Sequence, residues 1–349
     1  MLIHVLGTAS LEGSSIAEFA AALAHVVPRG GPPPELWFLI APGPLLDRFT
    51  AEGLTARFVR WDGGWRDPLG ALRFLRMLLR HRVVLVHQHF GSRLARLLAR
   101  IVGAKVVVNI HGRESEQSGK VSERIYMPWA DAVIANSAAI ARAVVGRTPV
   151  VAYMFVPSRA RSVGVRKSND TLVIGAARRL ARFKGLEDLL EAFVLLHSEF
   201  PKIRLEIAGT GPLREKLERC ANELGISEQV CFLGWREDIG CVMAGWDIAV
   251  VPSHEEGLGV AAIEAMAASL PVVATAVGGL PEVVLDRVTG LLVPAREPAA
   301  LAGALRELLR SPHLRETFGE AGRKRAEEAF SLERTAAIVE SVYQQVING

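Results

Sequence analysis

Two glutamates flank a glycine-bearing turn in the second half of the chain. Glu256 precedes Gly257 and Gly259, and Glu264 follows eight residues after Glu256, inside an alanine-rich stretch that predicts a helix. The apolar run directly before the turn predicts a buried strand, and ligands of open parallel sheets bind beyond the carboxyl ends of strands. Glycines allow the backbone to approach a ligand. The free N–H groups and partial positive charge at the start of the following helix suit a diphosphate.

Glu264 needs a partner if it is buried. Its neighbours on the predicted helix are alanines, and a carboxylate among small apolar side chains is costly to bury alone. A ribose diol would be a suitable partner, because one carboxylate can accept hydrogen bonds from two hydroxyls. A structural ion pair is the alternative, and the residue types do not choose between the two.

A basic loop is predicted at the same edge of the sheet. Arg179 and Lys184 follow a strand predicted at 171–177 and precede a predicted helix. Two cations in this place would neutralise a diphosphate leaving group. The alternative is a solvated loop, in which Arg178, Arg179 and Arg182 face water.

Short apolar runs alternate with helical stretches along the chain, which predicts βαβ units and parallel sheets. Several runs do not alternate with polar residues, as expected of strands that are covered on both faces. We therefore expect an α/β protein with two doubly wound, Rossmann-like domains. Strands are expected at 2–6, 36–40, 56–59, 83–87, 105–110, 132–135, 171–177, 203–208, 230–233, 248–251, 272–275 and 291–293. Helices are expected at 14–26, 68–79, 92–102, 186–200, 212–224, 260–268, 298–309 and 331–346.

The alternation pauses once, in a polar and basic stretch that predicts an interdomain linker at 159–170. An N-terminal domain is then expected at 1–158 and a C-terminal domain at 171–330. A last helix within 331–349 is expected to pack back on the N-terminal domain, because it carries an apolar stripe. The stripe consists of Ile338, Val339, Val342 and Val346.

The composition excludes several classes of protein. The 349 residues are 50% hydrophobic and 22% charged, which is typical of a globular chain. No apolar run approaches the ~18 residues of a membrane-spanning helix, and the N-terminus lacks the basic start of a signal peptide. The three cysteines have neither disulfide-framework nor zinc-site spacing, so we expect reduced thiols in a cytoplasmic protein.

Neither nucleic acid, NAD nor metal is indicated. The net charge of +4 comes from dispersed arginines without a recognisable nucleic-acid-binding module. The Gly209-Thr-Gly211 pair lacks the third glycine of a dinucleotide fingerprint. No Asp-x-Asp pair lies in a suitable loop, and we interpret His87 and His89 as structural or cleft-lining residues rather than metal ligands.

Together these segments resemble the retaining glycosyltransferases of family 4, which have the GT-B fold of two Rossmann-like domains facing each other across a cleft. The resemblance is strongest from about 171 to 293. In the first half, His111-Gly112 is similar to the family's active-site His-Gly. The motifs that match are Arg179-Leu-x-x-x-Lys184-Gly185, Gly209-Thr-Gly-Pro-Leu-Arg214, Phe232-Leu-Gly-Trp235, Pro252-Ser-x-x-Glu-Gly-x-Gly259, Glu264-Ala-Met-Ala-x-x-x-Pro-Val-Val273 and Gly278-Gly-Leu-Pro-Glu282.

The chain departs from the family pattern at three places. Arg178 stands where the family commonly has glycine before Arg-Leu, and Leu258 replaces the usual phenylalanine. The N-terminal glycine loop of the family usually has two adjacent glycines, whereas this chain has only Gly7 and Gly13 in that region.

The resemblance implies transfer of a sugar from a nucleotide diphosphate sugar, with retention of the anomeric configuration. Arg179 and Lys184 would stabilise the charge that develops on the diphosphate. Glu264 would hold the ribose, Glu256 would bind donor-sugar hydroxyls near the anomeric carbon, and His111 would lie near the donor sugar and the acceptor. The other implied donor-binding residues are Gly13, Gly257, Leu258, Gly259 and Val260.

The implied acceptor is a glycan, a lipid-linked molecule or a small molecule, in polysaccharide or glycolipid biosynthesis of the bacterial type. No metal and no cofactor beyond the donor are implied. Basic, apolar helices at 72–82 and around Arg93, Arg96 and Arg100 suggest peripheral contact with an anionic membrane at the inner membrane face. The alternative is that they are ordinary crossover helices whose apolar sides face the sheet. A nucleotide-sugar epimerase and an inactive sugar-nucleotide-binding protein of the same fold are the alternative functions.

Overall fold

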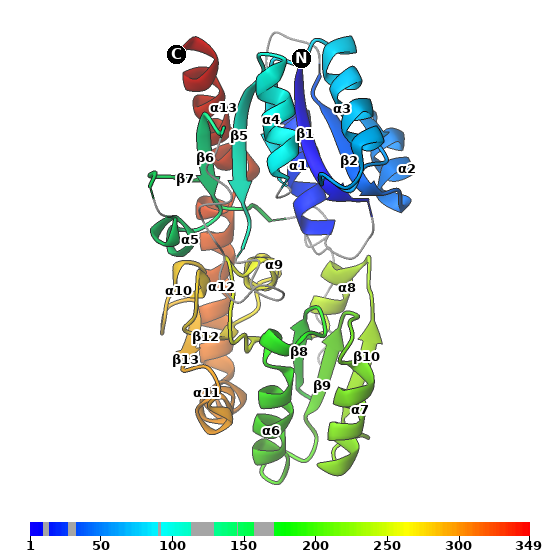
Figure 1. Ribbon diagram of the computed structural model, residues 1–349. Coiled ribbons are helices and arrows are strands. Elements are labelled where there is room, and N and C mark those ends of the chain that lie inside the picture. Colours follow the sequence, from blue (N-terminus) through cyan, green and yellow to red (C-terminus); the bar gives the residue numbers. More distant parts are fainter. Residues whose placement is uncertain (10–13, 27–32, 90–91, 113–128, 145, 157–170) are drawn as a thin grey trace. The chain divides into compact units, whose positions relative to one another are not determined.

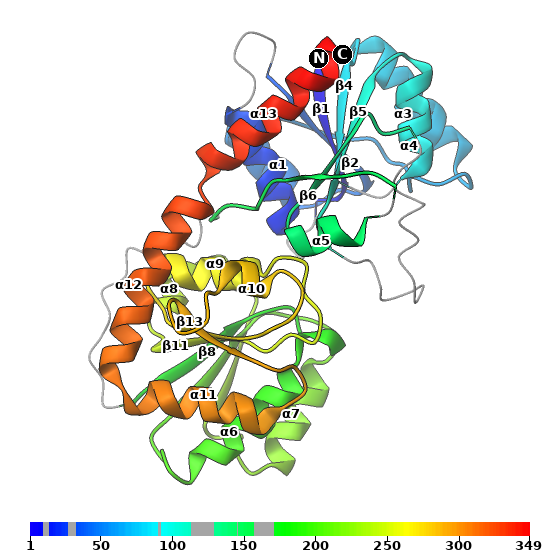
Figure 2. The ribbon, with the colours of Figure 1, turned by 90° about the vertical axis from the view of Figure 1, so that its left-hand side faces the viewer.

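The computed structural model divides the chain into two compact units. Unit 1 comprises Met1–Met154 together with Leu332–Gly349, and unit 2 comprises Phe155–Ser331. Figures 1 and 2 show one layered α/β body for each unit. The structure describes all residues except 10–13, 27–32, 90–91, 113–128, 145 and 157–170. Gly13 and the predicted linker at 159–170 therefore lie outside the described residues.

Unit 1 is built around a seven-stranded parallel sheet in the order β3-β2-β1-β4-β5-β6-β7. Its strands are β1 Leu2–Thr8, β2 Glu35–Ala41, β3 Thr55–Phe58, β4 Leu85–Gln88, β5 Lys105–Ile110, β6 Ala132–Ala135 and β7 Val150–Val151. Its helices are α1 Ser14–Val26, α2 Pro44–Ala51, α3 Pro68–Arg80, α4 Arg93–Ile101, α5 Ala138–Ala143 and α13 Leu332–Asn348.

Helices cover both faces of this sheet, which explains the uninterrupted apolar runs. Phe74 of α3 and Leu98 of α4 belong to one hydrophobic core, and Phe49 of α2 belongs to the other, together with alanines of α1. In Figure 2 the strands lie between α3 and α4 on one side and α1 and α13 on the other. The Thr335 hydroxyl of α13 donates a hydrogen bond to the carbonyl of Tyr153 at 2.8 Å.

Unit 2 has a six-stranded parallel sheet in the order β10-β9-β8-β11-β12-β13. Its strands are β8 Val173–Ala177, β9 Arg204–Ala208, β10 Val230–Gly234, β11 Ile248–Val251, β12 Val272–Thr275 and β13 Gly290–Val293. Its helices are α6 Leu186–His197, α7 Arg214–Glu223, α8 Ile239–Met243, α9 Val260–Ala267, α10 Leu280–Val283, α11 Pro298–Arg310 and α12 Pro312–Ala329, with a short 3₁₀ turn at Arg182–Lys184. Figure 2 shows α6, α7 and α11 on one face and α8, α9 and α12 on the other.

The strand order reverses once in each sheet, between β1 and β4 in unit 1 and between β8 and β11 in unit 2. Loops that leave two such neighbouring strands run to opposite faces and open a crevice between them, which is where doubly wound sheets bind ligands. Both reversal points carry the polar residues described below.

The structure agrees with most predicted elements and adds several that the periodicity missed. The strands expected at 105–110, 132–135, 248–251 and 272–275 have those bounds in the structure. The long helix α12 was missed because eight of its 18 residues are charged and its buried face is formed partly by glycines. The two residues of β7 are too few to show a period. The first unit ends at Met154 rather than at 158, and the Val156 N–H already pairs with the Phe330 carbonyl of unit 2.

The basic helix face expected around Arg93, Arg96 and Arg100 is smaller than predicted. Arg96 is fully buried and donates to Gln88 at 3.3 Å, whereas Arg93 and Arg100 are exposed. Arg100 forms a two-fold contact with Asp131 at 2.9 and 3.0 Å. Across the described part of the chain, no helix is both long and apolar enough to cross a membrane.

Candidate functional site

Two loops of unit 2 meet where its strand order reverses. Gly185 has a left-handed backbone (φ 65°), and a Cβ there would lie 1.8 Å from the carbonyl oxygen of Pro252. The loop after β8 can therefore pack against the loop after β11 only with glycine at this position. The contact is fixed further by His254, whose N–H donates to the Phe183 carbonyl at 2.9 Å and whose ring lies 2.7 Å from Asp188 Oδ2.

A third loop, after β12, packs against the same place. Gly278 also has a left-handed backbone (φ 54°), and a Cβ there would lie 1.7 Å from the Glu256 carbonyl oxygen. The Thr275 hydroxyl donates to the Ser253 carbonyl at 2.6 Å. The loops after β8, β11 and β12 therefore pack together and fix the backbone around Ser253 and Glu256.

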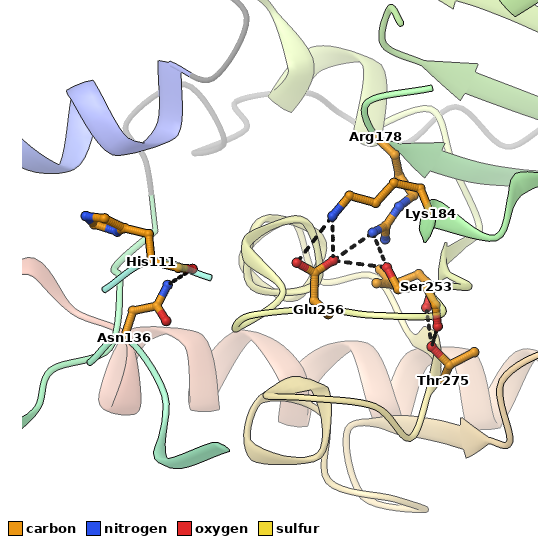
Figure 3. Close-up of polar contacts among 8 residues, drawn as sticks. His111, Asn136, Arg178, Lys184, Ser253, Glu256 and Thr275 are labelled. Atoms are coloured by element: carbon orange, nitrogen blue, oxygen red, sulfur yellow. Dashed lines mark hydrogen bonds and ion pairs between the residues drawn. The ribbon is translucent and has the colours of Figure 1, made fainter. Parts of the chain in front are cut away.

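The Glu256 carboxylate is the centre of a polar cluster (Figure 3). Its Oε2 accepts hydrogen bonds from Arg178 Nη2 at 2.8 Å, Ser253 Oγ at 3.0 Å and Lys184 Nζ at 3.1 Å. Its Oε1 lies 3.4 Å from the same Lys184 nitrogen. Arg178 Nη2 also donates to Ser253 Oγ. We call Arg178, Lys184, Ser253 and Glu256 the carboxylate cluster.

The cluster keeps Glu256 ionised. Burial alone would raise the pKa of this carboxyl group, but the charges and hydrogen bonds of Lys184 and Arg178 outweigh burial and lower the pKa to about 2. One partly buried carboxylate, 15% exposed, thus faces two cations. The cluster carries a formal net charge of +1 that an anionic ligand could neutralise.

The helix that follows the turn starts where the sequence predicted. Gly259 has a left-handed backbone (φ 100°) and precedes Val260, the first residue of α9. The Leu258 side chain is buried beneath the turn. Glu264 is buried on α9 as well, being 5% exposed, in agreement with the reasoning that it needs a polar partner.

The two adjacent arginines after β8 point in different directions. Arg179, the predicted diphosphate ligand, is exposed, whereas Arg178 is buried and contacts Glu256. The predicted alternative of a solvated loop therefore does not hold for Arg178. The Arg178 N–H pairs with the Ala208 carbonyl at 2.7 Å, so strand pairing continues one residue beyond β8. Alternation along that extension separates the two side chains.

Arg178 and Ser253 are the site residues that the sequence reasoning did not select. The signal for Arg178 was its place where similar proteins commonly have glycine, combined with the alternation of the strand before it. Ser253 stands in the Pro252-Ser-x-x-Glu motif, but serine at a strand end is common in loops, so its residue type alone did not select it.

In unit 1, His111 follows β5 and is the partly buried last member of a chain of imidazoles whose other members are buried. His111 Nε2 lies 3.0 Å from His89 Nδ1, and His89 Nε2 lies 3.0 Å from His4 Nδ1. Asn136 Nδ2 donates to the His111 carbonyl at 2.8 Å (Figure 3). Burial lowers the pKa of both His4 and His111 to about 3.

The imidazole chain begins at the reversal point of the sheet. His4 of β1 and His87 of β4 are direct partners in the parallel register. Burial also lowers the pKa values of His87 and His89 well below their ordinary value. The Nδ1 of His87 contacts the Tyr343 hydroxyl of α13 at 2.5 Å.

Three of these residues, His4, His87 and His89, each place one nitrogen within 4.8 Å of the others, which is close enough for a shared cation. Hydrogen bonds already account for four of the six ring nitrogens of these three histidines. We therefore keep the interpretation of His87 and His89 as structural residues.

Comparison with known proteins identifies the family. A profile described as "Glycosyl transferases group 1" matches residues 159–325, and one described as "Glycosyltransferase Family 4" matches residues 19–152. A D-inositol 3-phosphate glycosyltransferase of Geodermatophilus obscurus is 34% identical over 276 residues, which are 71% of this chain and 60% of that protein. The putative glycosyltransferase EpsD of Bacillus subtilis is 35% identical over 180 residues, covering 52% of this chain and 46% of EpsD. The chain thus spans about half the length of the curated relatives it matches.

Solved structures confirm the fold. Anabaena HepE, crystallised with UDP and glucose, superposes with a TM-score of 0.85 at 20% identity, covering 98% of this chain and 99% of HepE. Sucrose-phosphate synthase from Thermosynechococcus elongatus gives a TM-score of 0.75 at 22% identity, covering 100% and 99% of the two chains. The predicted GT-B architecture is confirmed, and the chain belongs to the family 4 glycosyltransferases.

Proposed function

We propose that this chain is a retaining glycosyltransferase that moves a sugar from a nucleotide diphosphate sugar to a glycan, a lipid-linked acceptor or a small molecule, in polysaccharide or glycolipid biosynthesis. The observation that carries the proposal is the carboxylate cluster at the reversal point of the unit 2 sheet. An ionised, partly buried carboxylate between two cations is suited to binding neutral hydroxyls and an anionic diphosphate side by side.

Each residue of the site then has a role. Lys184 and Arg179 bind the diphosphate and stabilise the negative charge that grows on it as the glycosidic bond breaks. The backbone of Gly257, Leu258, Gly259 and Val260, at the start of α9, supplies N–H groups to the same anion. These N–H groups come from the turn that three strand ends fix in place, so they need little reorganisation when the donor binds.

The two glutamates divide the neutral part of the donor between them. Glu256 accepts hydrogen bonds from the donor sugar near its anomeric carbon, and Glu264 accepts them from the ribose. His111 keeps its predicted role toward the donor sugar and the acceptor, and Gly13 its predicted role in donor binding.

Retention can proceed on one face of the sugar. The departing phosphate oxygen takes the proton of the acceptor hydroxyl while the new glycosidic bond forms on the side from which the phosphate leaves. This path needs no protein nucleophile. The proposal also needs no metal, since two cations and a helix N-terminus already offset the charge of the diphosphate.

UDP-glucose is the first donor to test, because HepE was crystallised with UDP and with UDP-glucose. In a thermal-shift panel of nucleoside diphosphates and their sugars, the compound with the correct base should raise the melting temperature, since a ligand stabilises the folded state by mass action. Product configuration is then read by NMR. An inverted anomeric carbon would refute retention.

Two variants test the assignments. Glu264→Ala should weaken nucleotide binding, and Glu256→Ala should mainly lower the rate of transfer. Glu228→Ala removes an exposed glutamate of the same unit and serves as the control. Unchanged binding and turnover in both site variants would refute the site.

The same assays separate the alternative functions. An epimerase converts the donor when no acceptor is present, whereas a transferase needs an acceptor or releases only slow hydrolysis product. An inactive binding protein would show the thermal shift without turnover in either condition.

A lipid-linked acceptor, and with it peripheral membrane contact, is supported by α3. Phe74 and Leu78 of this helix are buried against the sheet, but Leu69 and Leu72 are 72% and 42% exposed. Arginines line the same side of the helix and form a shallow hollow with the two leucines; they are Arg73, Arg76 and Arg80. Exposed leucines between arginines suit the boundary between lipid headgroups and acyl chains.

Vesicle flotation tests this contact. The chain should float with vesicles that contain phosphatidylglycerol and not with neutral vesicles. Replacing Leu69 and Leu72 together by serine should abolish flotation, whereas Leu195→Ser, at an exposed leucine of unit 2, should not. A chain that never floats with anionic vesicles would refute membrane contact.

A further inference from the structure

Arg178 is an unusual residue for the wall of this site. Its side chain is only 2% exposed, although it carries a full charge. Its Nη2 donates to Glu256 and to Ser253. Its Nε and Nη1 are buried without a hydrogen-bond partner among the described residues. A buried guanidinium with two unpaired nitrogens is a poor choice for stability alone.

The hydrogen bonds of Glu256 are divided unequally between its two carboxylate oxygens. Oε2 accepts three hydrogen bonds, from Arg178, Ser253 and Lys184, so its acceptor capacity is used. Oε1 has only the longer contact with Lys184, at 3.4 Å. The carboxylate is thus anchored through one oxygen, and the other oxygen remains available to a ligand.

We propose that Arg178 is a positioning residue that acts through Glu256: it provides the permanent countercharge of that carboxylate, so that Lys184 can exchange its contact with Glu256 for one with the donor diphosphate. The proposal deepens the proposed function and rests on it. Arg178 itself need not touch the donor.

The charges make the dependence clear. With Arg178 present, Glu256 has two cationic partners, and one of them can leave without exposing a bare, partly buried carboxylate. Without Arg178, Lys184 is the one cation among the described residues that still forms an ion pair with Glu256. Releasing Lys184 to a diphosphate would then leave the carboxylate uncompensated, which is strongly unfavourable in a buried site. Donor binding and Glu256 positioning would compete for one lysine.

The placement of the two arginines supports this division of work. Arg179, one residue further, is exposed and can reach a ligand, while Arg178 faces inward to Ser253 and Glu256. A glycine at position 178, as similar proteins commonly have, could not supply the countercharge. This chain therefore has an added positive charge next to Glu256, and its effect must be visible in donor affinity.

The test is the affinity of the full chain for UDP, measured by calorimetry at pH 7.5. Arg178→Met should weaken UDP binding by about tenfold, the effect expected when a charged hydrogen-bonding partner is lost. Removing the carboxylate as well, in Arg178→Met/Glu256→Gln, should restore binding to within about threefold of the unmodified chain. Restoration by a second substitution is what a merely structural arginine would not show.

Two further variants complete the series. Arg182→Met removes an exposed arginine from the same loop and should leave UDP affinity unchanged. Arg178→Lys keeps the charge and should bind UDP nearly as well as the unmodified chain, which keeps the test valid if Arg178→Met folds poorly. In transfer assays Arg178→Met should lower kcat more than tenfold. Added to Glu256→Gln, the same substitution should lower kcat no further than Glu256→Gln alone does.

The outcomes are distinct. If the unmodified chain binds no nucleoside diphosphate, the proposed function fails and this inference fails with it. If the unmodified chain binds UDP and Arg178→Met binds it equally well, only the role of Arg178 is refuted. The same holds if the double variant is weaker than Arg178→Met, because the arginine would then not act through Glu256.

Discussion

Acidification should unfold unit 1 through its buried histidines. His4, His87, His89 and His111 are held neutral, with the pKa of His4 and of His111 lowered from 6.5 to about 3 by burial. In the unfolded chain each would regain an ordinary pKa near 6.5. A histidine whose pKa is lowered by folding contributes its full stability above pH 6.5 and loses it as the pH falls toward 3.

The expected effect is large. At pH 5, about 1.5 units below the ordinary histidine pKa, protonation stabilises the unfolded chain by ~2 kcal/mol for each histidine that stays neutral in the folded state. His4 and His111 together amount to ~4 kcal/mol relative to pH 8, a large part of the ~5–15 kcal/mol of total stability of a typical domain. The lowered pKa values of His87 and His89 act in the same direction, so unit 1 should lose much of its stability by pH 5.

Urea unfolding at pH 8, 6.5, 5.5 and 5 measures this dependence, and hydrogen exchange with mass detection assigns the loss to unit 1. His4→Gln removes one titrating group but keeps a side chain that can hydrogen-bond to His89, so the slope of stability against pH should fall by about one proton. His25→Gln, at an exposed position of α1, is the control and should leave the slope unchanged. Equal stability of unit 1 at pH 8 and pH 5 would refute the reasoning.

Two further predictions concern the packing of the loops in unit 2. Gly185→Ala should lower the free energy of unfolding by ~2 kcal/mol or more, because its Cβ would meet the Pro252 carbonyl at 1.8 Å. Gly103→Ala has a similar backbone (φ 80°) but open space around it, so in urea melts it should cost only the ~1 kcal/mol of the left-handed conformation. Thr275→Val removes the hydrogen bond to the Ser253 carbonyl and should cost ~1 kcal/mol; an unchanged urea midpoint would show that this contact does not hold the loop.

The fold was predictable because its strands are apolar on both faces. The runs 248–251 and 272–275 have no polar interruption, and all eight of their residues are buried in the structure. Helix α12 escaped prediction for the opposite reason, since its buried positions include Gly319, Gly322 and the long side chain of Arg315.

Motif spacing within the sequence was enough to predict the site residues that lie in neighbouring loops. Glu256 and Lys184 lie in two loops that the parallel order of the strands brings to one edge, and the structure joins them at 3.1 Å. The choice between Arg178 and Arg179 needed the direction of each side chain, which depends on a single backbone pairing with Ala208. The contact of His4 with His89, 85 residues apart, depended on the register of two strands.

The two sheets use their reversal points in electrostatically opposite ways. In unit 1 the buried groups are imidazoles that folding keeps neutral, so acid removes stability. In unit 2 the group is the carboxylate of Glu256, whose pKa of about 2 keeps it ionised between pH 5 and 8. A change in turnover between pH 5 and 8 therefore cannot arise from protonation of Glu256. It must come from the donor phosphates, from the acceptor or from loss of unit 1, and circular dichroism over the same range separates the last from the others.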